Sequence, residues 1–144
     1  MSAEQVRETL QQYLEVLLAR GSYGRFFDDD TEFALMGTDQ QTQGAEAAEQ
    51  TIRYLHETAF DAEPEFTSLV VDEHGAAAEA IFVGTHIGDF SGVSATGNSV
   101  RVPYSVFYDV DGDKIKSLRI YLPMDQLIAQ IGGVTEPEVA RSKG

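Results

Sequence analysis

Residues 84–92 read Gly-Thr-His-Ile-Gly-Asp-Phe-Ser-Gly, and residues 95–98 read Ala-Thr-Gly-Asn. This stretch, dense in glycine and serine, lies between two apolar runs at residues 80–87 and 100–110. Apolar runs on both sides of such a segment are typical of a β-hairpin whose tip needs unusual backbone angles. The pattern therefore predicts a long hairpin in the second half of the chain.

A third apolar run, residues 115–122, follows the sequence Asp111-Gly112-Asp113. Aspartate and glycine in this order favour a tight turn. The second half of the chain is therefore predicted to form three consecutive antiparallel strands, which carry most of its aromatic and β-branched residues. We expect the functional site to lie against this sheet.

The first half of the chain predicts two helices and two strands. Apolar residues recur at helical spacing in residues 2–20, and Ser2 with Gln5 has the form of a capping box. A strand is expected at residues 31–36, a polar loop at 39–43, a second helix at 44–60 and another strand at 66–71. This order predicts an α+β domain in which a curved antiparallel sheet wraps around helices. Such a cone leaves a cavity between the concave face of the sheet and the first helices.

The end of the chain contains a strand break and a predicted tail. Pro123 ends the last strand, and Asp125 is placed to cap a short helix that runs to about residue 130. Residues 133–144 hold glycines, a proline and few apolar residues, which favours a frayed tail. We therefore expect one domain over residues 1–132 and a flexible tail after it.

The net charge restricts the class of partner. The chain has 144 residues and a formal charge of −14, from 24 acidic and 10 basic residues. A field of this sign repels phosphate backbones and anionic membranes, so we expect neither nucleic acid nor a membrane as a partner. A neutral, mostly apolar small molecule is the ligand class that remains, because a buried pocket and not surface charge provides its affinity.

Cysteine content and hydropathy add two expectations. The chain has no cysteine, which excludes disulfides and thiolate chemistry and fits a cytoplasmic protein. No apolar run approaches the roughly 20 residues of a membrane span, and residues 1–20 are polar and periodic, unlike a secretory signal.

The acidic clusters and the histidines predict no metal site and no cofactor. Counted from Asp109 as an EF-hand loop, the positions that need glycine and glutamate hold Lys114 and Ile120. The three histidines lack metal-ligand spacing. His74 is expected in an exposed turn, His56 near the edge of the apolar face of the second helix, and His86 near the end of a strand that lines the cone.

The string GTHIGDFSG-x-x-ATG-x-x-V-x-VP, followed by DGDKI and by RIY ahead of QLIAQIG, resembles the SnoaL-like polyketide cyclase family. That family belongs to the nuclear-transport-factor-2-like superfamily, and the likeness runs from the first helix to about residue 132. It implies an α+β cone and a homodimer formed through the face of the sheet opposite the cavity. It does not select one activity, because the superfamily contains cyclases, isomerases, epoxide hydrolases, dehydratases and non-catalytic binding proteins.

The family resemblance also directs attention to the last strand. In relatives this strand ends with Arg-x-Tyr-x-Asp, and the aspartate acts as general acid/base in the cavity. Arg119 and Tyr121 match this string, but Pro123 stands where the aspartate is expected and cannot transfer a proton. We therefore expect Asp125 or His86 as proton shuttle, with Arg119 and Tyr121 as hydrogen-bond donors on one inward face. The alternative roles are helix capping for Asp125 and a structural hydrogen bond for His86.

Aromatic residues are expected in the core by default, and some of them in the wall of a cavity. The expected ligand-contacting set is Tyr13, Phe27, Phe33, Tyr54 and Tyr104. The sequence thus predicts a protein that binds a small, mostly apolar or polyketide-like molecule, with cofactor-free cyclisation, isomerisation or hydration–dehydration as its chemistry. The alternative is a non-catalytic binding protein on the same scaffold, because Pro123 replaces the usual aspartate.

Overall fold

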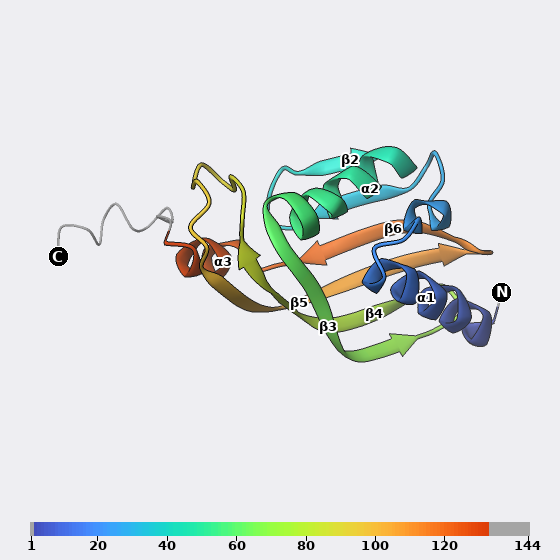
Figure 1. The fold of residues 1–144 in the computed structure, drawn as a ribbon. Coiled ribbons are helices and arrows are strands. Elements are labelled where there is room, and N and C mark those ends of the chain that lie inside the picture. Colours follow the sequence, from blue (N-terminus) through green and yellow to red (C-terminus); the bar gives the residue numbers. More distant parts are fainter. Residues whose placement is uncertain (1, 133–144) are drawn as a thin grey trace.

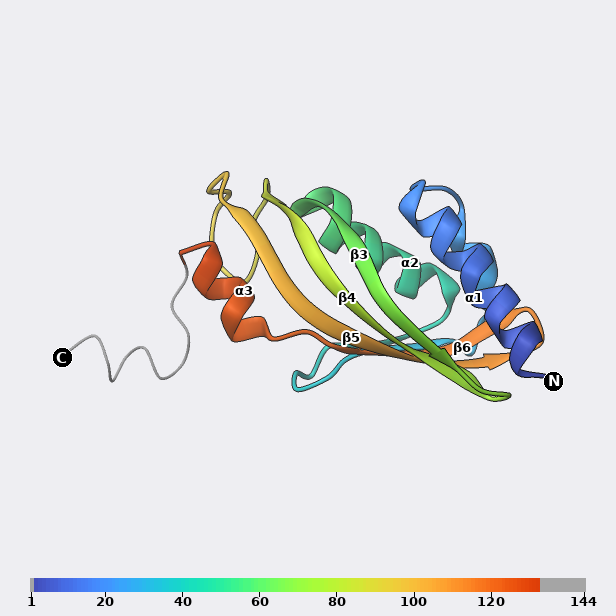
Figure 2. The ribbon, with the colours of Figure 1, turned by 90° about the horizontal axis from the view of Figure 1, so that it is seen from below.

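Six strands form one curved sheet, and two helices lie against its concave face (Figures 1 and 2). The structure is a computed structural model that describes residues 2–132. The helical elements are α1 (Ala3–Leu18), the 3₁₀ turn η1 (Tyr23–Phe26), α2 (Ala45–Arg53), the π-helical turn η2 (Tyr54–Thr58) and α3 (Met124–Gln130). The strands are β1 (Glu32–Leu35), β2 (Gln41–Gln43), β3 (Phe60–Val71), β4 (Gly75–His86), β5 (Ser99–Asp111) and β6 (Lys114–Tyr121).

The strand order is β2-β1-β6-β5-β4-β3. The two predicted hairpins are confirmed, since β4 pairs antiparallel with β5 and β5 with β6. The prediction of a wholly antiparallel sheet is wrong at one pairing, because β1 lies parallel to β6. A parallel pair needs a long crossover connection, and here that connection includes α2 and the four strands β2 to β5. Local patterns do not reveal a partner so distant in the sequence.

The first helix begins as predicted. The backbone N–H of Gln5 donates to the Ser2 hydroxyl (3.2 Å), and the Gln5 side-chain oxygen accepts from the Ser2 N–H (2.9 Å). Val6, Leu10 and Tyr13 are buried beneath the helix, on the face that meets the sheet. This capping box and this apolar stripe fix where α1 starts and which face it presents.

The segment after α2 differs from the prediction. The helix expected over residues 44–60 ends its α-helical part at Arg53 and continues as the π turn η2, and β3 begins at Phe60 and not at residue 66. Buried Phe60, Ala62 and Pro64 alternate with exposed acidic residues in this part of β3. The acidic residues and the proline had the composition of a loop, although the burial alternates with the period of a strand. The loop expected at residues 39–43 contains the edge strand β2.

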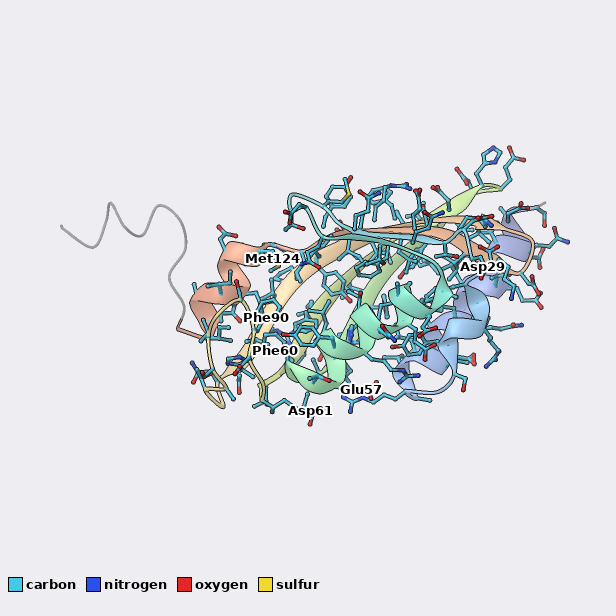
Figure 3. The ribbon with its side chains drawn as sticks, turned by 90° about the horizontal axis from the view of Figure 1, so that it is seen from above. Asp29, Glu57, Phe60, Asp61, Phe90 and Met124 are labelled. Atoms are coloured by element: carbon cyan, nitrogen blue, oxygen red, sulfur yellow. The ribbon has the colours of Figure 1, made fainter. Side chains whose placement is uncertain are left out.

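The buried side chains form two clusters. One lies beneath α1 and α2, around Tyr13, Phe33 and Tyr108. The second lies towards α3, where Phe60 meets Phe90 edge to face with ring centroids 5.1 Å apart (Figure 3). Together the helices on one face and the curved sheet give the α+β cone that the sequence predicted. The predicted tail at 133–144 lies outside the described residues.

Gly84 allows β3 to approach β4 at the curved end of the sheet. A Cβ atom at this position would lie 2.5 Å from the Ala62 Cβ and 2.6 Å from the Asp61 carbonyl oxygen. Both contacts involve atoms fixed by the β3 backbone, so neither can rotate away. The glycine in the stretch that predicts the hairpin is therefore required by the packing of two strands.

We expect Gly84→Ala to lower the free energy of unfolding by about 1–3 kcal/mol, the usual cost of overpacking a filled site. Urea unfolding of the wild type and the variant measures this difference. Gly21→Ala is the matched control, because a Cβ there would lie 3.1 Å from Val16 Cγ1 and 3.6 Å from the Val16 carbonyl oxygen, both farther than the contacts at Gly84. Equal losses in the two variants would contradict the close approach at Gly84.

Candidate functional site

An apolar cavity lies between the helices and the concave face of the sheet. Every layer of the cone contributes to it, from α1 through η2 to the β5 and β6 strands. Its lining residues are Tyr13, Leu17, Phe33, Ile52, Leu55, His56, Phe66, Phe82, Tyr104, Val106, Tyr108, Leu118, Ile120 and Leu122. An enclosed, mostly apolar space with a few polar groups is the usual form of a small-molecule site.

Strand alternation determines which residues reach the cavity. Along β5, Tyr104, Val106 and Tyr108 point inward, and the residues between them point to the other face. Along β6, Leu118 and Ile120 are the inward residues. Because the strands are paired along their length, these side chains form a continuous wall.

The cavity is narrow. It offers about 50 Å³ to the centre of a water molecule, and a single buried water needs about 10–15 Å³ on this measure. The space therefore holds a few waters or a small ring as it stands. A larger ligand requires rotation of lining side chains.

Three tyrosine hydroxyls provide hydrogen-bond donors in this apolar wall. Tyr13, Tyr104 and Tyr108 line the cavity, and none of the three hydroxyls is hydrogen-bonded to a residue that the structure describes. Burial raises the pKa of each phenol well above its ordinary value, so all three stay protonated at neutral pH. They can donate hydrogen bonds to a ligand oxygen.

His56 provides the only imidazole among the described lining residues. Its Nδ1 lies 2.8 Å from the Ile52 carbonyl oxygen. A carbonyl oxygen only accepts, so Nδ1 carries the proton and Nε2 carries the lone pair. Nε2 is buried and has no hydrogen-bond partner among residues 2–132.

The surroundings of His56 favour the neutral ring. Burial lowers the pKa of His56, and the nearby Arg20 cation lowers it further. The hydrogen bond to the Ile52 carbonyl and the Glu57 carboxylate act in the opposite direction. The Arg20 guanidinium donates to the His56 carbonyl oxygen at 3.2 Å and pairs with Asp61 at 2.7 Å.

The π-helical turn positions His56. The Ala59 N–H donates to the Tyr54 carbonyl oxygen, five residues earlier, at 2.8 Å. Such a turn inserts an extra residue into a helix, and π turns are frequent at functional sites. The sequence placed His56 at the edge of a regular helix, so its place in the cavity wall was missed. No local sequence pattern predicts the π turn.

No carboxylate lines the cavity within the described part of the chain. The acidic residues nearest to His56 lie at the rim, where Glu57 pairs with Arg53 and Asp61 with Arg20. Figure 3 shows Glu57 and Asp61 at the outer edge of this turn and Asp29 at the far end of the molecule. The imidazole is therefore the strongest base in the cavity wall.

Asp125 lies away from this cavity. It is exposed in the first turn of α3, and its carboxylate accepts the Gln126 N–H at 2.9 Å. The N-cap of α3 is Pro123, so the predicted capping position for Asp125 is wrong by two residues. Asp125 still supplies negative charge to the N-terminal turn, which favours the helix dipole.

Arg119 and Tyr121 share a face, as alternation predicted, but it is the outer face of the sheet. Arg119 donates to Asp109 at 2.7 Å and to Ser117 at 2.8 Å. The Tyr121 ring meets Phe107 at a centroid distance of 5.7 Å. The expected inward orientation is wrong because Leu118 and Ile120 cover the concave side. On the outer face the arginine is paired and partly hydrated, which avoids the cost of an unpaired buried charge.

His86 is completely buried but lies outside the cavity wall. Its Nδ1 accepts the Thr96 N–H at 3.2 Å and lies 2.9 Å from the Thr96 hydroxyl. These bonds join the end of β4 to the glycine-rich segment before β5. The structure thus gives His86 the hydrogen bonds of a structural residue.

The expected aromatic set divides between cavity and core. Tyr13, Phe33 and Tyr104 line the cavity. Phe27 is buried against Tyr13, with ring centroids 5.6 Å apart, and does not line it. Tyr54 is 41% exposed, and its hydroxyl donates to the Asp89 carbonyl oxygen. It borders a neighbouring pocket that shares Phe33 and Leu55 with the cavity.

The described residues contain no group of three or more histidine or acidic side chains placed to hold a metal ion. Among the same residues, no helix has both the length and the apolar character needed to cross a bilayer.

A family model for the SnoaL-like polyketide cyclase matches residues 8–131, which include every lining residue of the cavity. The chain belongs to this family. A search of the curated proteins finds no match.

Solved structures agree with the family assignment at the level of fold. A proposed polyketide cyclase from Xanthomonas campestris pv. campestris superposes with a TM-score of 0.80 at 17% identity, covering 90% of this chain and 98% of the other. A proposed SnoaL-like polyketide cyclase from Jannaschia sp. CCS1 gives 0.81 at 18%, covering 92% and 95%. AclR, a proposed hydroxylase from Streptomyces galilaeus, gives 0.77 at 18%, covering 99% and 95%.

We expect His56 to be the neutral Nδ1–H tautomer at neutral pH and to titrate below about 6.5, the ordinary histidine value. A pKa lower in the folded than in the unfolded protein means that stability is full above the unfolded value and is lost as pH falls towards the folded one. Nitrogen-15 NMR of the imidazole rings measures the tautomer and the pKa of His56, and the exposed His74 provides the internal reference signal. An Nε2–H tautomer at neutral pH would contradict the assignment.

Proposed function

We propose that this family member binds a small, mostly apolar, polyketide-like molecule that carries a carbonyl group. The supporting observation is the combination of an apolar wall with the hydroxyls of Tyr13, Tyr104 and Tyr108, which lack partners in the described chain. A ligand oxygen that accepts a hydrogen bond from one of these hydroxyls adds favourable free energy to the apolar contact. A hydrocarbon of the same shape cannot accept this hydrogen bond.

The family and the names of its structural relatives extend the proposal to chemistry. Two of the compared structures are proposed polyketide cyclases and a third is a proposed hydroxylase. For this chain we propose cofactor-free acid/base turnover of the bound carbonyl compound, namely cyclisation, isomerisation or hydration–dehydration. Neutral phenols that stabilise negative charge on a carbonyl oxygen serve all three reactions.

A non-catalytic binding protein is the second candidate function. It is favoured by one observation, the absence of a carboxylate from the described cavity wall, together with Pro123 at the position where relatives carry the catalytic aspartate. In that case the cavity binds its ligand without changing it. Binding followed by product analysis separates the two candidates.

We also propose a homodimer formed through the outer face of the sheet. The side chains of Val70, Phe107 and Tyr121 remain 66%, 42% and 45% exposed there. Val70 and Phe107 both lie opposite Ala77 in neighbouring strands, so the apolar surface is continuous across β3, β4 and β5. A second copy of the chain would bury this surface, as in the dimers of the family.

Ketone binding is tested with Val106→Phe, which adds a ring at a position that points into the cavity. We expect calorimetric affinity for cyclohexanone, 1-indanone and 2-tetralone to fall by at least about tenfold, since about 1.4 kcal/mol of lost contact suffices. Ser105→Phe, one residue away and outward-facing, is the control and keeps wild-type affinity.

Tyr104→Phe preserves the volume, and we expect it to lower the affinity for ketones by roughly 2- to 10-fold through one lost hydrogen bond. Failure of all three ketones to bind the wild type would contradict the proposed function.

The dimer is tested with Phe107→Glu, which places a carboxylate in the middle of the outer apolar surface. We expect sedimentation velocity to show a dimer for the wild type and a monomer for the variant, because a buried unpaired charge is costly. Glu15→Gln, at an exposed position of α1 on the concave side of the sheet, is the control that leaves the association unchanged. A monomeric wild type at micromolar concentration would contradict the dimer.

A further inference from the structure

We propose that His56 is the general base of the cavity and removes a proton from the carbon next to a ligand carbonyl. This inference rests on the proposed function, because it needs a carbonyl compound in the cavity. It goes further in assigning the proton transfer to a helix residue, in the absence of a carboxylate on the last strand.

The first observation is the orientation of the ring. The Nδ1–H of His56 donates to the Ile52 carbonyl oxygen of the preceding turn at 2.8 Å, so this edge of the ring is turned back towards its own helix. Nε2 lies on the opposite edge of the imidazole. His56 lines the cavity, and its buried Nε2 has no partner among the described residues, so the fold itself makes no use of this lone pair.

The second observation is the set of charged groups around the ring. Arg20 donates to the His56 carbonyl oxygen at 3.2 Å and opposes protonation of the ring. Glu57 is paired with Arg53 at 2.9 Å, so its carboxylate is partly neutralised. From the sheet and α1, the ionisable groups that reach the cavity are the protonated phenols of Tyr13, Tyr104 and Tyr108. The resting state is therefore a neutral imidazole.

The third observation connects the base and a hydrogen-bond donor through one shared neighbour. The Phe82 ring contacts both the His56 ring, at a centroid distance of 5.4 Å, and the Tyr104 ring, at 6.4 Å. The imidazole and the Tyr104 phenol thus flank one aromatic side chain of the cavity floor. A flat ketone lying on Phe82 can present its α-carbon to Nε2 and its oxygen to the Tyr104 hydroxyl.

The proton-transfer step balances with these groups alone. The α C–H bond breaks, its proton forms an N–H bond with Nε2, and the electron pair becomes the enolate, whose oxygen accepts from the Tyr104 hydroxyl. The imidazolium then returns the proton to another carbon of the conjugated system, which completes an isomerisation. In an alternative completion, the enolate carbon bonds to a second carbonyl carbon and that carbonyl oxygen takes the proton, which closes a ring. The substrate class is therefore a compact ketone or 1,3-dicarbonyl compound with an acidic α-proton.

Deuterium exchange at the α-carbon tests this step without knowledge of the natural substrate. Cyclohexanone, 1-indanone and 2-tetralone are incubated with the full-length protein in D₂O, and proton NMR follows the loss of the α-proton signals. We expect the wild type to accelerate exchange and His56→Gln to lower that rate by about 100-fold or more, the usual contribution of a general base. His74→Gln, in an exposed turn, is the matched control and exchanges at the wild-type rate.

Two further readouts separate a base from a structural residue. The wild-type exchange rate rises with pH through the His56 pKa measured by NMR and then stays constant, because only the neutral ring accepts the proton. In His56→Ala, added imidazole restores exchange in proportion to its concentration. Neither behaviour follows from a change in packing.

The outcomes distinguish this inference from the proposed function. Ketone binding without accelerated exchange, or equal exchange rates in wild type and folded His56→Gln, overturns His56 as the base and leaves ketone binding in place. Absence of ketone binding overturns both. If His56→Gln does not fold, the pH profile of the wild type provides the test. An exchange rate that does not change with pH through the His56 pKa overturns the inference.

Discussion

Side chains alternate along each strand, and helices cover only one face of the sheet. These two facts determine which residues line the cavity and which lie on the outer face. The sheet presents two faces, but α1 and α2 cover only the concave one (Figure 2). Every second residue of β5 and β6 must therefore be apolar on that side, and the residues between them meet solvent or a second copy. Tyr104 and Leu118 consequently form the cavity wall, while Phe107 and Arg119 lie on the outer face. A one-residue change of register would exchange the two sets.

The cavity wall keeps polar atoms at a cost that an ordinary core avoids. Leucine at His56 would remove a buried polar atom, Nε2, that lacks a partner in the described chain and costs about 1–3 kcal/mol. His86 Nε2 and Thr42 Oγ1 are also buried and unpartnered in the described chain, but neither residue lines the cavity. Of these three residues, only His56 lines an apolar space whose wall also carries three protonated phenols, which indicates a site and not a packing defect.

The sequence was sufficient for the fold class and the hairpins, but not for one strand pairing or for the site, and the reasons are physical. The hairpins around residues 84–98 and Gly112, the α1 capping box and the α+β cone follow from local turn chemistry and periodicity. The parallel contact of β1 with β6 depends on a partner far along the chain, which no local pattern encodes. Alternation grouped Arg119 with Tyr121 correctly, but it cannot say which face of a sheet is concave. The helices determine which face is concave, because they cover it. Arg119 and Tyr121 lie on the opposite, outer face.

His56 shows why the site was harder to predict than the fold. Its place in the cavity depends on the π turn at Tyr54–Thr58, a single backbone irregularity that changes the direction of the side chains after Arg53. Its tautomer depends on one carbonyl, that of Ile52, which accepts the Nδ1 proton and leaves the lone pair on Nε2. Proline at position 123 ends β6 without a carboxylate, so the strand that carries the base in relatives does not carry one here. A neutral histidine on the facing helix reaches the same apolar space from the other side. Unlike a carboxylate, it enters that space uncharged, so its burial does not require a paired cation. The cavity is apolar, and the last strand carries no carboxylate. Both features fit a base that remains uncharged until it accepts a proton.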